Sequence, residues 1–163
     1  YVWSGRSFKI PYNIREIYTF GEKIQFGIGG TSVQYQMDGW SGPEEGYTWT
    51  NGHNSILMIQ TSKPDSDLNL TINASQFTNL QRVNVTVNDH PVGNWLFDKS
   101  KDQEKSIVIP HSILNEGVQC ISFDLPDAKS PQSIKSNDSR TLALAVRSIV
   151  ITNSTESDLK AKE

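Results

Sequence analysis

The stretch DLNLTINA at residues 67–74 alternates apolar and polar side chains with a period of two, and RVNVTVND at 82–89 repeats this pattern. In an extended chain such alternation places the apolar side chains on one face and the polar ones on the other. The pattern is typical of strands that are buried on one side and solvated on the other. The residues predicted to face the interior are Leu68, Leu70, Ile72, Val83, Val85 and Val87.

Outward from these two stretches, other short β-rich runs are separated by turn residues. Asn88 to Pro91 predicts a hairpin connection in which the proline ends the strand ladder. IPHSILNEG at 109–117 predicts one short helical turn, and no window of ten residues shows a helical period. Many short strands with regular turns predict an all-β fold, an antiparallel β-sandwich of the jelly-roll type. The other predicted strands are 16–20, 23–28, 33–38, 47–50, 55–61, 92–97, 105–109, 118–124 and 141–151.

Length and charge limit the organisation and the partners. The chain has 163 residues, which fits one domain, and we expect the sandwich at 15–152, a linker or edge strand at 1–14 and a polar tail at 153–163. The formal net charge is −3 and no basic stripe is present, which argues against a nucleic-acid partner. The first residues lack the basic and apolar regions of a signal peptide, and we expect a piece of a larger protein with its targeting signal or anchor elsewhere.

The most unusual stretch is GWSGPEEGYTWTNG at residues 39–52, where aromatic and acidic residues gather between glycines. Flat rings stack on the apolar face of a pyranose, and carboxylates accept hydrogen bonds from its hydroxyls, so the stretch is a candidate carbohydrate site. In the alternative interpretation the tryptophans fill the core, and a glutamate caps backbone amides or pairs with an arginine. The candidate residues here are Trp40, Glu44, Glu45, Tyr47 and Trp49.

A second notable stretch, SNDSR at 136–140, places Asp138 and Arg140 directly before the last strong strand. Arg140 would fix the loop through Asp138, or reach Glu44 or Glu45 in a bidentate pair. We therefore add both residues to the candidate carbohydrate site, beside the alternative of a local structural clamp. No cofactor is expected. Calcium is conceivable because jelly-roll loops offer oxygen ligands, but no dedicated calcium-loop motif is present.

Catalytic patterns are missing from the sequence. A glycosidase needs two carboxyl groups roughly 5–10 Å apart across the scissile bond, and the neighbouring Glu44 and Glu45 need not converge in that way. No GxSxG elbow and no phosphate-binding loop occurs. The histidines show no zinc-ligand spacing, and the lone Cys120 is expected to be a small buried apolar residue. We therefore expect no enzymatic activity from this domain.

Three ordered blocks of the sequence resemble a known group of domains. They are YQMDGWSGPEEGYTWTNGHNSILMIQ at 35–60, QRVNVTVNDHPVGNW at 81–95 and FDLPDAKSPQSIKSNDSRTLALAVRSI at 123–149. Together they resemble the β-sandwich accessory domains of bacterial cell-envelope glycan enzymes, namely the C-terminal domain of phosphoglycerol transferases and the extracytoplasmic domains of membrane glycosyltransferases. Two positions depart from that pattern: Asp89 stands where a hairpin glycine is usual, and Gly46 where a tryptophan is common.

The resemblance implies a fold like that of carbohydrate-binding modules and a periplasmic or extracytoplasmic location, tethered to the membrane through other parts of the parent protein. The resemblance also implies two partners. One is a membrane-anchored catalytic domain, and the other is a glycan that would be bound through Trp40, Glu44, Trp49, Asp138 and Arg140. The leading hypothesis is a noncatalytic accessory module that binds carbohydrate. The alternatives are a purely structural or protein-interaction domain, an enzyme, and a phage receptor-binding jelly roll.

Overall fold

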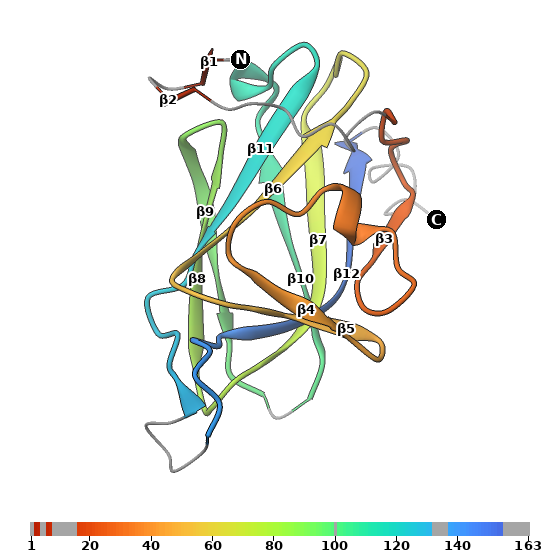
Figure 1. The fold of residues 1–163 in the computed structure, drawn as a ribbon. Coiled ribbons are helices and arrows are strands. Elements are labelled where there is room, and N and C mark those ends of the chain that lie inside the picture. Colours follow the sequence, from red (N-terminus) through yellow and green to blue (C-terminus); the bar gives the residue numbers. More distant parts are fainter. Residues whose placement is uncertain (1, 4–5, 8–15, 100, 132–136, 155–163) are drawn as a thin grey trace, which may run out of the picture.

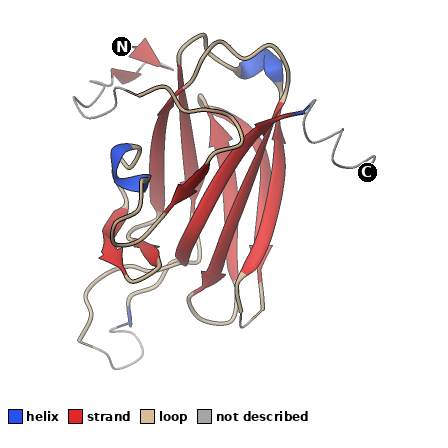
Figure 2. Cartoon of the chain, turned by 90° about the vertical axis from the view of Figure 1, so that its right-hand side faces the viewer, coloured by secondary structure: helices blue, strands red, loops and turns tan. Residues whose placement is uncertain are grey.

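Two antiparallel β-sheets face each other across a shared apolar core (Figure 2). This architecture comes from a computed structural model that describes residues 2–3, 6–7, 16–99, 101–131 and 137–154. The predicted all-β, jelly-roll-like sandwich is confirmed. Among the described residues, no helix has the length and apolar character needed to span a membrane.

The two layers differ in size (Figure 1). The larger sheet has six strands; five follow one another across it, and β3 pairs with β12. In order across the sheet the five are β10 (Gln103–Ile109), β7 (Leu68–Gln76), β12 (Leu144–Asn153), β5 (Tyr47–Thr50) and β4 (Trp40–Glu44), with β3 at Lys23–Gln25. The smaller sheet contains, in order, β6 (Asn54–Gln60), β11 (Val118–Asp124), β8 (Gln81–Val87) and β9 (His90–Phe97). The remaining elements are β1 (Val2–Trp3), β2 (Arg6–Ser7) and the 3₁₀ turns η1 (Ser32–Gln34) and η2 (His111–Ile113).

The core between the layers follows the predicted alternation. Every second residue of β7 from Leu68 to Ala74 is buried, and β8 repeats the pattern at Val83, Val85 and Val87. The aromatic rings of Trp95, Phe97 and Phe123 complete the interior from the smaller sheet. Full burial of one large apolar side chain contributes about 1.5–3 kcal/mol, so this shared interior holds the two sheets together.

An irregularity in β12 shapes the outer face of the larger sheet. β12 pairs with β7 along its whole length, but the register shifts between Val146 and Ser148. Ala145 lies opposite Trp49 of β5 before the shift, and Ser148 lies opposite Asn73 of β7 after it. The extra residue is Arg147, which is half-buried next to the half-buried Ser148. A bulge of this kind re-aims a side chain, here a guanidinium at the centre of the sheet.

A small second cluster covers part of the smaller sheet on its outer side. Met37 packs there against Ile56, Met58, Val118 and Cys120. Cys120 is 1% exposed, which confirms the prediction of a buried thiol. The segment that carries Met37 is tied to β6 by three backbone hydrogen bonds: the Met37 amide donates to Ile56, the Ile56 amide to Asp38 and the Met58 amide to Tyr35.

Several predicted elements were wrong. Residues 33–38 were predicted as a strand but form the end of η1 and a single bridge from Gln36 to Leu57. The reason is that this segment crosses the outer side of β6, where Met37 packs against the second cluster. The predicted strand 16–20 is reduced to one bridge at Tyr18. Pro91 does not end the ladder but lies within β9, an edge strand whose outer side needs no amide donor. The predicted helical turn is confirmed as η2, and residues 155–163 of the predicted tail lie outside the described part of the chain.

Candidate functional site

The β4–β5 hairpin presents two aromatic side chains on the outer face of the larger sheet. Along β5, Thr48 and Thr50 are buried, whereas Tyr47 and Trp49 are half-exposed. The Thr48 hydroxyl accepts a hydrogen bond from the Gly27 amide at 3.1 Å, and that of Thr50 accepts one from the Leu144 amide at 3.0 Å. Because the inward threonines are fixed to neighbouring backbone, the alternation of the strand holds Tyr47 and Trp49 outward.

Trp49 lies between two other rings. Its ring centroid is 6.0 Å from that of Tyr47 and 6.0 Å from that of Phe77, with interplanar angles of 89° and 90°. All three side chains are half-buried, and we call them the aromatic cluster. Phe77 was not among the residues predicted from the sequence, although its side chain continues the outward alternation of Asn73 and Ser75 just beyond β7.

Arg140 connects the loop before β12 to β4, next to the aromatic cluster. Its Nη2 lies 2.6 Å from Oδ2 of Asp138, and its Nε lies 3.0 Å from both oxygens of that carboxylate. Its Nη1 donates to the Ser41 hydroxyl at 2.9 Å and lies 3.8 Å from Oε1 of Glu44. The bidentate partner of Arg140 is therefore Asp138, and Glu44 makes a single longer contact. The clamp that we considered as an alternative is present, and it brings Glu44, Asp138 and Arg140 together.

Hydrogen bonding to the Arg140 side chain, helped by the Arg140 backbone amide, lowers the pKa of Asp138 from 3.8 to about 2. A carboxyl whose pKa is lowered on folding stabilises the fold above its unfolded pKa, and that contribution is lost as the pH falls from about 4 through 2. We expect NMR titration of the Asp138 side-chain carbon to give a midpoint near 2, and the clamp to persist at pH 4. A midpoint near 3.8 would mean that the ion pair does not form in solution.

Arg147 borders the aromatic cluster on another side. Its guanidinium carbon lies 5.5 Å from the centroid of the Tyr47 ring, within the range of a cation–π contact. Its Nε lies 2.7 Å from Oδ2 of Asp102. The two side chains form an ion pair, but the Nε–H is not directed at the carboxylate oxygen, so this contact is not a hydrogen bond. Its Nη1 donates to the Gly46 carbonyl at 3.4 Å. The bulge in β12 thus places a second guanidinium beside the rings.

Two of the sequence candidates lie apart from this group. The Trp40 ring packs against Phe26 at a centroid distance of 5.2 Å, and its indole N–H donates to the Ile56 carbonyl at 2.9 Å. This placement agrees with the alternative interpretation of Trp40 as a core residue. Glu45 is exposed at the two-residue turn between β4 and β5.

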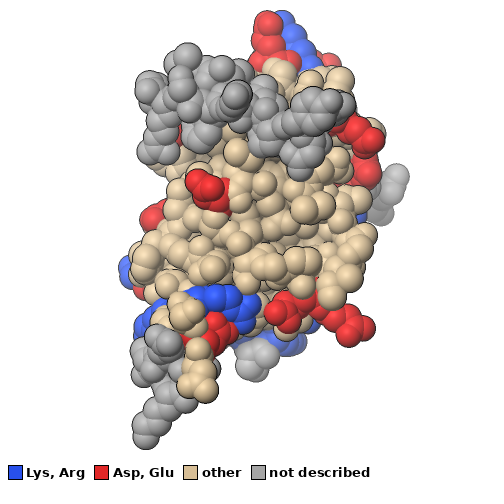
Figure 3. Space-filling view, viewed as in Figure 1, with Lys and Arg blue, Asp and Glu red and all other residues tan. Residues whose placement is uncertain are grey.

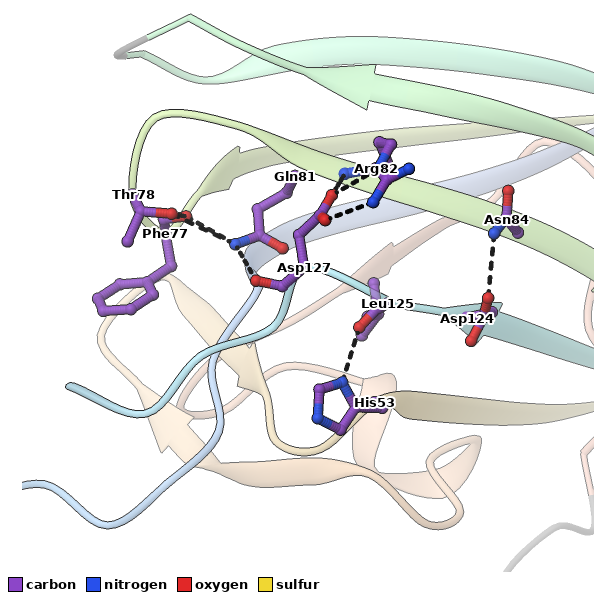
Figure 4. A network of polar contacts seen from close by, with 9 residues as sticks. All are labelled: His53, Phe77, Thr78, Gln81, Arg82, Asn84, Asp124, Leu125 and Asp127. Carbon is purple, nitrogen blue, oxygen red and sulfur yellow. Dashed lines mark hydrogen bonds and ion pairs between the residues drawn. The ribbon is translucent and has the colours of Figure 1, made fainter. Parts of the chain in front are cut away.

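A polar network fixes the loop that follows Phe77 (Figure 4). The buried Gln81 amide donates to the carbonyls of Phe77 at 2.8 Å and Asp127 at 3.2 Å. Arg82 forms a bidentate pair with the Asp127 carboxylate at 2.9 and 2.8 Å. Thr78 has a φ of 67°, which is unusual for a β-branched residue and persists only where surrounding contacts enforce it. The network therefore holds Phe77 in place.

Charges around these loops are mixed. In Figure 3, acidic and basic atoms lie side by side along the lower edge of the molecule and form no patch of one sign.

Beside the Phe77 loop a pocket of about 230 Å³ is lined by Thr78, Asn79, Leu80, Asp127 and Lys129. Within the described ranges, no three or more His, Cys, Asp or Glu side chains are grouped so as to hold a metal ion.

No family model and no curated protein matches this sequence, but solved structures share its fold. The C-terminal family 6 carbohydrate-binding module of a marine laminarinase from Zobellia galactanivorans has a TM-score of 0.51 and 9% identity, over 81% of this chain and 98% of that one. A family 35 carbohydrate-binding module from Clostridium thermocellum has a TM-score of 0.50 and 13% identity, over 82% and 99%. At these identities the likeness establishes the jelly-roll β-sandwich fold.

Proposed function

We propose that this domain is a noncatalytic carbohydrate-binding module that holds a glycan on the outer face of its larger sheet, around Trp49. The observation that carries the proposal is the position of this ring. The ring is half-exposed and braced at right angles by Tyr47 and Phe77. Polar groups are supplied by Glu44, on the same β4–β5 hairpin, and by Arg140, in the loop before β12. Sugar sites combine apolar walls with a few placed polar groups in this way.

The binding mechanism follows from the rigidity of these side chains. Trp49 loses little conformational freedom on binding, because its two neighbouring rings and the β5 backbone already fix it. The Glu44 carboxylate is 43% exposed and accepts hydrogen bonds from sugar hydroxyls, while its contact with Arg140 keeps it oriented. Each hydrogen bond replaces one to water at a small net gain, so the stacking on Trp49 supplies most of the affinity.

The proposed setting is a cell-envelope protein that modifies glycans, either a glycosyltransferase or a phosphoglycerol transferase. The support for it is the ordered resemblance of residues 35–60, 81–95 and 123–149 to accessory domains of such enzymes. In that setting the domain lies in the periplasm or outside the cell, tethered to the membrane through its parent protein. It would hold the glycan near a membrane-anchored catalytic domain, which is its second partner.

A glycan array followed by fluorescence titration tests the proposal. The domain contains four tryptophans, and a sugar stacked on Trp49 is expected to change their emission in a saturable way. We expect dissociation constants in the micromolar to millimolar range, with binding driven by a few weak contacts. If no oligosaccharide on the array binds and emission stays constant at millimolar glucan, the domain is a structural or protein-interaction sandwich.

A further inference from the structure

Resting on the proposed function, we propose in addition that the glycan held around Trp49 is uncharged, and that the site discriminates against glycans carrying carboxylate or phosphate groups. Recognition of such anions in proteins relies on cationic side chains, above all on bidentate pairs with arginine. Among the described residues, the guanidiniums of Arg140 and Arg147 lie beside the aromatic cluster, and their protein partners decide how well this part of the surface accepts an anion.

Arg140 is already engaged with protein acceptors. Its Nε and Nη2 donate to Asp138 at 2.6–3.0 Å, and its Nη1 donates to Ser41 at 2.9 Å and lies near Glu44. An anionic ligand would have to displace Asp138, and it would leave that carboxylate without its partner beside the new negative charge. Like charges in such a position oppose binding.

Arg147 also lies beside a carboxylate of the protein, although its Nε–H does not point along a hydrogen bond to it. Asp102 lies 2.7 Å from its Nε, the Gly46 carbonyl accepts from its Nη1, and the Tyr47 ring covers its guanidinium carbon. Lys99 and Lys101, close to Asp102 in the chain, are exposed single charges and lack the planar fork that binds a carboxylate bidentately. Both guanidiniums thus have carboxylate partners within the protein.

The same arrangement suits hydroxyl groups. The carboxylates of Glu44, Asp102 and Asp138 are 27–43% exposed in their side chains, so their free lone pairs remain open to donors. A sugar hydroxyl donates to them, whereas a ligand carboxylate or phosphate dianion has no proton to donate.

Matched oligosaccharides test this selectivity. Gluco-, manno- and galacto-oligosaccharides are titrated calorimetrically at low salt, each beside the same chain with its primary hydroxymethyl groups oxidised to carboxylates. We expect the oxidised form of each bound oligosaccharide to bind at least about tenfold more weakly, with a smaller difference at high salt. Equal or tighter binding of oxidised chains overturns the selectivity but leaves carbohydrate binding intact. If neither form of any chain binds, the proposed function itself fails, and the selectivity with it.

A charge variant tests the cause. Asp102→Asn frees the Arg147 guanidinium, so we expect it to strengthen binding of oxidised chains at least about threefold. Asp98→Asn, an equal change of charge on the same loop without contact to Arg147, is the control and should have a smaller effect. If the two variants behave alike, the pairing of Arg147 does not set the selectivity.

Discussion

Replacing Trp49 by alanine is expected to weaken glycan binding at least about tenfold, which corresponds to about 1.4 kcal/mol. Residues that carry binding energy are typically large rings in positions fixed by their neighbours, and Trp49 is braced in this way by Tyr47 and Phe77. The ring is half-buried on the outer face, so the sandwich core should survive its loss. Calorimetric titration with the best glycan, together with circular dichroism of the variant, checks both expectations.

A second tryptophan provides the matched control. Trp95 is 6% exposed in the interior, where its indole N–H donates to the Ser106 carbonyl at 3.0 Å. Trp95→Phe should lower stability and leave the affinity unchanged. Trp49→Phe keeps a flat ring and covers the case in which the alanine variant fails to fold; its affinity should fall between those of wild type and alanine. An unchanged affinity in a folded Trp49→Ala protein would remove the proposed site.

Replacing Gly39 by alanine should destabilise the domain by more than about 3 kcal/mol. Gly39 has a φ of 93°, and an added Cβ would lie 2.0 Å from the Asn54 carbonyl oxygen and 2.7 Å from the Ser55 Cα. These are backbone atoms of β6 and cannot swing aside. The Gly39 carbonyl also accepts from the Asn51 amide and from the Ser55 hydroxyl, so a shift would break two hydrogen bonds that hold the hairpin of the site.

Gly42, three residues along in β4, is the control. Its Cβ would have open space within 4 Å, and its φ lies outside the left-handed region. Gly42→Ala should therefore change the free energy of unfolding by less than about 1 kcal/mol. Urea denaturation of both variants gives the comparison, and a Gly39→Ala protein as stable as Gly42→Ala would show that the chain bends differently at Gly39.

Four strands were predicted with bounds close to those observed. Residues 118–124 and 47–50 were predicted with the observed bounds, and β7 and β8 to within two residues at each end. In β5, β7 and β8 alternate residues face the opposing sheet, so the local alternation matches the burial. β11 is buried on both faces and was found as a short β-rich run. β4 was not predicted, because its pairing with β5 contains a bulge between Trp40 and Pro43 and its composition resembles a turn.

Contacts within the candidate site that join distant parts of the chain could not be predicted from local sequence patterns. The outward position of Trp49 follows from the alternation of β5, but its contact with Phe77 joins residues 28 positions apart and depends on the order of strands in the sheet. For Arg140 the sequence left two partners open, Asp138 in the same loop or a glutamate of residues 44–45. Asp138 takes the bidentate contacts because it lies two residues away, and Glu44 makes a longer contact. The role of Arg147 depends on the bulge in β12, which no local period reveals.

The most direct test of the central claim uses the four indole N–H signals of the domain in a ¹H–¹⁵N spectrum. During titration with a neutral oligosaccharide that binds, we predict that the Trp49 indole signal and the backbone amides of Tyr47 and Phe77 shift together with one affinity. The contradictory result is that these signals stay fixed while residues elsewhere move, for instance around the pocket that His111, Ser112 and Leu114 line at the η2 end.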